Sequence, residues 1–201
     1  AAFMAAVIII SAAAGTAAHI ASANTAPMPV VVIDAGHGGI DAGVRGKVSG
    51  VKESEINLAI AYRLRDFFEG AGFCAVLTRK SQAGLYGLPT SGFKLRDMQR
   101  RREIIEESGA DMVISVHQNF YSDGARRGAQ VFFSPDSQSG KKLAACIQNS
   151  LNAMESAAEH SALAGDYYML RCTYAPSVIV ECGFLSNAED EALLNTAEYR
   201  R

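Results

Sequence analysis

The sequence of 201 residues has no excess of basic charge. Its 19 lysines and arginines are balanced by 21 aspartates and glutamates, so the formal net charge is −2. Nucleic-acid-binding domains normally carry a basic surface, and this balance therefore argues against a nucleic-acid partner. Neither a G-x-G-x-x-G fingerprint nor a Walker pattern occurs. A nucleotide-binding α/β protein is accordingly a poor fit.

Charged residues are also missing from the first 33 positions, and Asp34 is the first one. Residues 1–18 are apolar or small, and Ala21-Ser22-Ala23 fits a small-x-small cleavage site. The apolar stretch lies between the ~7–15 residues of a signal peptide and the roughly 20 residues of a membrane span. We expect residues 1–29 to be a signal peptide or a membrane anchor with a short linker, and the protein to be exported to the cell envelope or beyond it. A buried N-terminal helix is the alternative.

Paired cysteine spacings are absent as well. The chain has four cysteines but no C-x-x-C pair, which excludes a zinc ribbon and a thioredoxin-type site. Cys74 and Cys182 lie in strand-like apolar runs, so we predict that they are core residues. A core of this size does not need a disulfide, although the sequence leaves one disulfide open.

What the chain does have, from residue 30 to residue 201, is an alternation of apolar, β-branched runs with segments of helical periodicity. The predicted strands are 30–33, 73–78, 112–116, 130–133, 167–170 and 178–180, and the predicted helices begin near residues 54, 95, 143 and 188. This order predicts a single α/β domain, with a twisted, mostly parallel sheet and helices on both faces. Ser54 is the expected N-cap of the first helix. The last helix is expected to reach Arg201 and to be truncated there.

Polar side chains follow three of the predicted strands. His37 comes after 30–33 among glycines, His117 directly follows 112–116, and Glu181 directly follows 178–180. In open α/β sheets, ligands bind beyond the carboxyl ends of the strands. Imidazole is a good zinc ligand, and a catalytic zinc ion takes three protein ligands and leaves one position for water. The histidine pair therefore favours a metal site, and hydrogen-bonded structural histidines are the alternative.

A carboxylate between the two histidines would complete such a site. Glu53 and Glu55 both lie where the first predicted helix begins, and a carboxylate in a first turn also stabilises the helix dipole. Glu181 is costly to bury directly after an apolar run unless it is paired or functional. It is either the partner of a buried arginine, for example Arg171, or a general base and acid beside a zinc-bound water.

Two basic clusters remain, Arg100-Arg101-Arg102 and Arg126-Arg127. The first is followed by glutamates at the spacing that forms ion pairs along a helix. We therefore predict a solvated helix face and a solvated loop. Contact with anionic wall polymers is the alternative.

Four ordered blocks, at residues 31–39, 52–59, 110–119 and 170–171 with 176–187, carry a family resemblance. Together they resemble the zinc-dependent N-acetylmuramoyl-L-alanine amidases, the cell-wall hydrolases of the third amidase type. The resemblance covers roughly residues 30–200. The short single-domain layout is most similar to the germination-specific amidases of spore-forming bacteria, which strip stem peptides during modification of the spore cortex.

The resemblance implies that His37, Glu53 and His117 bind one Zn²⁺ and that Glu181 is the catalytic carboxylate. It selects Glu53 over Glu55 because Glu53 occupies the glutamate position of the family's second block. The implied reaction is hydrolysis of the amide that joins N-acetylmuramic acid to L-alanine in peptidoglycan.

Three further residues are expected to bind substrate or to support the site. Gln118 and Asn119 are placed to orient substrate, and a simple turn after the strand is their alternative role. Arg171 is expected to position Glu181 or to bind a stem-peptide carboxylate.

Two other functions stay open at this point. A zinc peptidase that cleaves within the stem peptide would use the same kinds of ligand. A catalytically silent wall-binding module would keep the fold and lose the chemistry. The sequence does not reveal the oligomeric state, the preference for cortex or vegetative wall, or whether an accessory protein loads or holds the metal.

Overall fold

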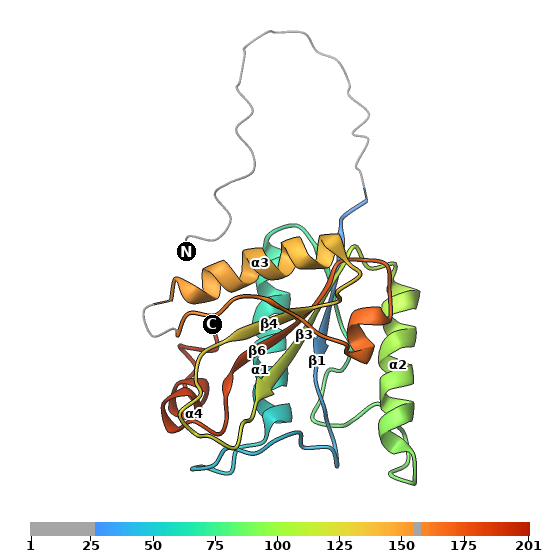
Figure 1. Cartoon of the computed structure of the whole chain (residues 1–201). Coiled ribbons are helices and arrows are strands. Elements are labelled where there is room, and N and C mark those ends of the chain that lie inside the picture. Colours follow the sequence, from blue (N-terminus) through green and yellow to red (C-terminus); the bar gives the residue numbers. More distant parts are fainter. Residues whose placement is uncertain (1–26, 155–157) are drawn as a thin grey trace, which may run out of the picture.

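A computed structural model describes residues 27–154 and 158–201 of the chain (Figure 1). The expected signal peptide or anchor therefore lies almost wholly outside the described residues. Within the described ranges, no helix combines the length and apolar character that a membrane crossing requires.

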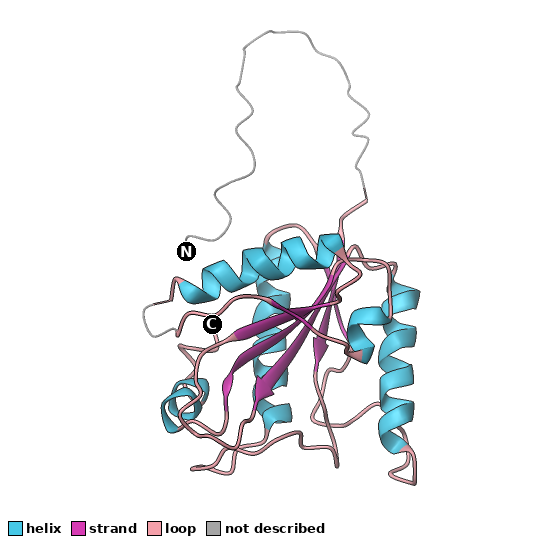
Figure 2. Ribbon diagram, viewed as in Figure 1, coloured by secondary structure: helices cyan, strands magenta, loops and turns pink. Residues whose placement is uncertain are grey.

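The centre of the fold is a twisted sheet that contains six strands in the described part of the chain (Figure 2). The strands are β1 (Val30–Ala35), β2 (Cys74–Leu77), β3 (Met112–Asn119), β4 (Gln130–Phe133), β5 (Leu163–Ala164) and β6 (Ser177–Phe184). Their spatial order is β2-β1-β3-β6-β4-β5, and only β4 and β6 pair in antiparallel fashion within these strands. The prediction of a mostly parallel α/β sheet is confirmed.

Helices cover both faces of this sheet. They are α1 (Glu53–Gly70), α2 (Phe93–Ser108), α3 (Gln138–Asn152) and α4 (Ala188–Leu194). Helices α1 and α3 pack on one face, and α2 packs on the other together with the short 3₁₀ helix η1 (Tyr168–Arg171). The fold is thus a three-layer arrangement around a single sheet.

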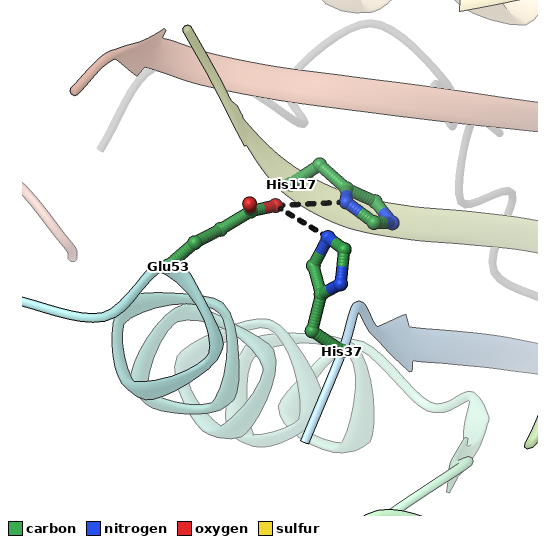
Figure 3. A group of neighbouring side chains, drawn as sticks. All are labelled: His37, Glu53 and His117. Atoms are coloured by element: carbon green, nitrogen blue, oxygen red, sulfur yellow. Dashed lines mark hydrogen bonds and ion pairs between the residues drawn. The ribbon is translucent and has the colours of Figure 1, made fainter. Parts of the chain in front are cut away.

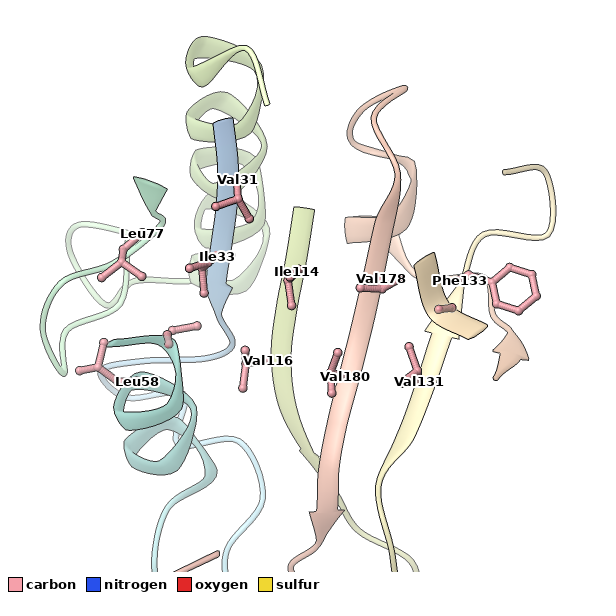
Figure 4. Close-up of a cluster of buried hydrophobic side chains, with 13 residues drawn as sticks. Val31, Ile33, Leu58, Leu77, Ile114, Val116, Val131, Phe133, Val178 and Val180 are labelled. Carbon is pink, nitrogen blue, oxygen red and sulfur yellow. The ribbon is translucent and has the colours of Figure 1, made fainter. Parts of the chain in front are cut away.

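Strand β1, which lies between β2 and β3, shows why this arrangement forms. Its side chains alternate between the two faces. Val31 and Ile33 belong to the cluster that α1 and α3 cover (Figure 4), whereas Val32 belongs to the cluster beneath α2. All three are 0% exposed, and burying each such side chain is worth roughly 1.5–3 kcal/mol. The continuous apolar run at residues 30–33 therefore places β1 inside the molecule.

Two predicted elements differ in the structure. Residues 167–170 are predicted as a strand, but Tyr168–Arg171 form η1, because Met169 is buried on the α2 side of the sheet while β5 takes the place beside β4. The last helix ends at Leu194 and not at Arg201, and a series of turns follows it.

Two individual residues also differ from their predictions. Helix α1 begins at Glu53 with Lys52 as its N-cap, so Ser54 lies inside the first turn, where it is buried. Cys74 is exposed at the start of β2, which is an edge strand of the sheet in the described part of the chain, whereas Cys182 is half-buried against the core. All four cysteines are free thiols.

Candidate active site

The three polar strand ends lie together at one rim of the sheet. Strand β3 lies between β1 and β6, and His117 of β3 is in register with Glu181 of β6. His37 lies in the loop directly after β1. Parallel pairing of neighbouring strands therefore brings His37 and Glu181, which are 144 positions apart in the sequence, to the same rim. The sequence predicts this arrangement.

His37, Glu53 and His117 converge on one point from three elements (Figure 3). The Oε1 atom of Glu53 lies 3.2 Å from Nε2 of His37 and 2.9 Å from Nδ1 of His117. One potential ligand atom from each residue lies within 4.8 Å of the others. Two imidazole nitrogens and one carboxylate oxygen are a donor set of catalytic zinc sites, so these residues fit a bound divalent metal.

Glu53 is held in place from several directions. Its Oε2 accepts a hydrogen bond from the backbone N–H of Val44 (2.9 Å), and its Oε1 accepts bonds from the N–H of Gln118 (3.1 Å) and the side chain of Asn57 (3.3 Å). Burial alone would raise the pKa of Glu53, but the two histidines hold it well below its ordinary value. The carboxylate therefore stays ionised. Glu55, by contrast, is exposed to solvent and pairs with Lys52.

The backbone around the cluster leaves no room for extra side-chain atoms. A Cβ on Gly36 would lie 2.2 Å from the ring of His117, and a Cβ on Gly43 would lie 2.3 Å from Oε2 of Glu53. Gly43 also has a positive φ of 66°, which side chains disfavour. Two of the glycines in this loop are therefore required by close approach to the side chains of His117 and Glu53.

Two buried arginines that the sequence analysis missed fix the same loop. Arg101 donates to the carbonyls of Ala35 (2.7 Å) and His37 (2.6 Å), and Arg79 donates to those of Ala35 (2.8 Å) and Gly36 (3.1 Å). The predicted solvated face is therefore wrong for Arg101, which is 1% exposed.

The neighbours of Arg101 behave as predicted. Arg100 pairs with Glu103, and Arg102 pairs with Glu106, both on the exposed side of α2. The burial of Arg101 has a signal in the sequence. Asp97 and Ile105 lie four residues to either side of Arg101 and share its buried face of α2.

Glu181 faces the cluster across a cavity of about 300 Å³ whose walls include both histidines. Its Oε2 is buried and has no hydrogen-bond partner in the described part of the chain. Burial raises the pKa of Glu181 to about 7, and the carboxylate of Glu53 adds to this effect. Arg171 is exposed and pairs with Asp166, so the interpretation of Glu181 as its ion-pair partner is wrong. A proton-accepting group thus lies beside the metal-binding cluster.

The remaining candidates occupy different places. Gln118 is buried in β3, and its side chain donates to Asn57 (3.1 Å), which itself bonds Glu53. Asn119 ends β3, and its side chain accepts from the N–H of Phe120 (2.8 Å). Both residues belong to the strand, so the alternative of a turn is wrong. Gln118 supports the metal-binding carboxylate indirectly, and Arg171 lies outside the residues that line the cavity.

The outer cavity wall is largely aromatic. Tyr86 and Phe93 meet edge to face at 5.2 Å, and Tyr167 and Tyr168 approach from the segment around η1. Lys94 contributes a cation that is 69% exposed. The cavity therefore offers apolar contacts and an exposed positive charge beside the polar cluster.

Comparisons with known proteins agree with this geometry. A family model described as N-acetylmuramoyl-L-alanine amidase matches residues 31–201. The germination-specific N-acetylmuramoyl-L-alanine amidase of Bacillus subtilis (strain 168) is 31% identical over 176 residues, which are 85% of this chain and 73% of the relative.

Two solved structures share the fold. The CwlD amidase from Clostridioides difficile, in complex with the GerS lipoprotein, superposes with a TM-score of 0.81 at 36% identity, covering 86% of this chain and 90% of the other. The amidase AmiC2 of Nostoc punctiforme has a TM-score of 0.73 at 30% identity and covers 86% and 88%. This chain belongs to the N-acetylmuramoyl-L-alanine amidase family, and its activity is that of a peptidoglycan amidase.

Proposed function

We propose that the chain is a zinc-dependent amidase that removes stem peptides from peptidoglycan during modification of the spore cortex. The observation that carries the catalytic part is the convergence of His37, Glu53 and His117 beside the unpaired carboxylate of Glu181. The similarity to a germination-specific amidase supports the cortex as the site of action. Export to the cell envelope follows from the same proposal, because the substrate lies outside the cytoplasmic membrane.

The metal site divides the chemistry between the ion and the protein. A bound zinc ion would polarise the scissile carbonyl and make water more acidic. His37, Glu53 and His117 would hold the ion, and the bonds from Val44 and Asn57 to Glu53 keep that carboxylate in place. Because this orientation exists before substrate binds, little reorganisation is needed during the reaction.

Glu181 would move the proton. Its carboxylate would take a proton from the attacking water and then deliver it to the nitrogen of L-alanine as the amide bond breaks. A pKa raised to about 7 suits both roles, because the group can accept and release a proton near neutral pH. The products are the free lactyl carboxylate on the sugar and a peptide with a free L-alanine amino terminus.

The aromatic cavity wall supports binding of the muramyl peptide. Tyr86, Tyr167 and Tyr168 provide apolar faces and hydroxyl groups around the space between the cluster and the solvent. Such an arrangement suits a ligand that combines methyl groups, a sugar ring and peptide amides. We assign the stem peptide and its sugar to this cavity.

An accessory protein is part of the same proposal. The solved CwlD amidase is in complex with a lipoprotein, and at 36% identity with a TM-score of 0.81 the two chains share the fold around the site. We propose that a partner of this kind also binds this chain and holds it at the membrane or helps it to retain the metal.

The test is a Glu181→Gln variant digesting purified peptidoglycan, with products identified by mass spectrometry. Loss of proton transfer should lower kcat/KM by about 10²–10⁴-fold without lowering the zinc content. Glu103→Gln, on the exposed side of α2, is the matched control and should remain active. Release of stem peptides by Glu181→Gln at near wild-type rate would refute the assignment. Wild-type products cut inside the stem would identify a peptidase instead.

A further inference from the structure

The second ring nitrogen of His37 has a carboxylate partner. Oδ2 of Asp41 lies 3.0 Å from Nδ1 of His37, while Nε2 of the same ring faces Glu53. We propose that Asp41 is a positioning residue for the metal: it fixes the ring of His37 so that the lone pair of Nε2 faces the cluster. This inference rests on the proposed metal site, and it adds a residue that the sequence analysis did not single out.

The two nitrogens of a neutral imidazole ring play different roles. A neutral histidine carries one N–H, and the nitrogen without it is the only one that can bind a metal. When Nδ1–H donates to Asp41, the proton is held on Nδ1 and Nε2 is left as the ligand atom. A carboxylate that accepts this bond also makes the ligating nitrogen more basic. Asp41 therefore acts on both the orientation and the affinity of His37.

The backbone places Asp41 for this contact. Gly38 donates to the carbonyl of Asp41 (2.8 Å), and Asp41 donates back to Gly38 (3.2 Å), so that the chain turns sharply between them. This turn brings a side chain four residues further along next to the ring of His37. His37 itself has a positive φ of 62°, which is uncommon for a residue with a side chain. The local conformation is thus one that a sequence adopts only when the surrounding contacts impose it.

The other oxygen of Asp41 has weaker contacts. Oδ1 lies 3.4 Å from the N–H of Gly43 and 3.6 Å from Nζ of Lys94. The strongest contact of the Asp41 carboxylate is therefore the one with the histidine.

His117 has no equivalent support within the described residues. Its Nδ1 faces Glu53, and no carboxylate in that part of the chain hydrogen-bonds its Nε2. Of the two histidines, His37 is consequently the one whose tautomer is set by a partner outside the metal cluster. Removing the charge of Asp41 should weaken metal binding while leaving the fold intact.

The experiment compares Asp41→Asn with wild type in the full chain. The dissociation constant for zinc is measured by competition with a chelating dye, and we expect it to rise about 10–100-fold. Asp123→Asn is the matched control, because Asp123 is an exposed loop aspartate. Its side chain accepts a hydrogen bond from the backbone N–H two positions later in the sequence, as that of Asp41 does. The zinc affinity of Asp123→Asn should equal that of wild type.

A second measurement separates positioning from a structural role. Denaturant unfolding of the metal-free proteins should give the same midpoint for Asp41→Asn and Asp123→Asn. A zinc affinity unchanged in Asp41→Asn, or a metal-free midpoint much lower than that of the control, would overturn the inference. The His37→Ala variant distinguishes a failure of the proposed metal site from a failure of the proposed role of Asp41. If it binds zinc like wild type, the metal site itself is wrong; if it loses zinc while Asp41→Asn keeps it, only the role of Asp41 is wrong.

Discussion

Replacing Arg101 with methionine should destabilise the protein strongly, although Arg101 reaches the loop after β1 through the backbone carbonyls of Ala35 and His37 rather than through the side chain of His37. Its Nη1 lies 2.6 Å from Oδ1 of Asp34, and its Nε lies 2.6 Å from Oδ2 of Asp97. Asp34 is 1% exposed. After the substitution, Asp34 would keep hydrogen bonds from Thr78 and Ser115 but would lose the charge that balances its own.

The magnitude follows from leaving that carboxylate unpaired. Breaking a buried ion pair on one side costs about 3–5 kcal/mol. The pKa of Asp34 gives a second value for the same energy. Burial would raise this pKa, but Arg101 and the two hydroxyls lower it from 3.8 to about 2. Such a shift corresponds to roughly 2–3 kcal/mol of stabilisation. Because the folded-state pKa is lowered, this stabilisation is present above about pH 4 and is lost as the pH falls through 2.

The assay is thermal and denaturant unfolding of the metal-free protein at neutral pH. We expect Arg101→Met to lower the Tm by roughly 6–20 °C, whereas Arg102→Met, which loses only an exposed pair with Glu106, should cost about 0–1 kcal/mol. Adding Asp34→Asn to Arg101→Met should cost less than the sum of the two single changes, since the unpaired charge is then gone. An Arg101→Met variant as stable as Arg102→Met would refute the reasoning.

Three further predictions concern the site. With saturating zinc, kcat/KM should decrease as the pH is lowered, because Glu181 must be ionised to accept a proton. The midpoint of this decrease should lie above pH 4.5, the ordinary pKa of a glutamate, and no higher than about pH 7. A midpoint below pH 4.5 in a pH–rate profile would contradict this. Gly36→Ala should abolish zinc binding, measured by elemental analysis, because its Cβ would overlap the ring of His117; full zinc content would contradict the packing argument. Glu53→Gln should lose zinc while Glu55→Gln keeps it, as measured by dialysis followed by metal analysis; the reverse order would exchange the two roles.

Much of the fold could be predicted from local pattern alone. The continuous apolar run in β1 and the helical spacing in α1 are signals that tertiary contacts reinforce. The segment of η1 could not be predicted in this way, because a short apolar run suits a strand and a helical turn equally well. Only its packing on the α2 side of the sheet decides between them.

The site residues divide in the same way. Two histidines and Glu181 could be identified because each lies just beyond an apolar run that forms a strand, and the carboxyl ends of parallel strands lie at one rim. Arg101 and Asp41 could not be identified by that rule, since their roles depend on which loop carbonyl or ring nitrogen lies opposite them. Contacts of this kind are set by three-dimensional placement: the spacing from Asp97 and Ile105 indicates that Arg101 is the buried member of its run, but not which groups it binds.

The central claim is that three side chains distant in sequence hold one zinc ion. Metal analysis of the purified wild-type protein and of His37→Ala, after dialysis against metal-free buffer, tests it most directly. The account predicts one zinc per wild-type chain and almost none in the variant. Equal zinc content in the two proteins, or no zinc in wild type even after zinc is added, would contradict it.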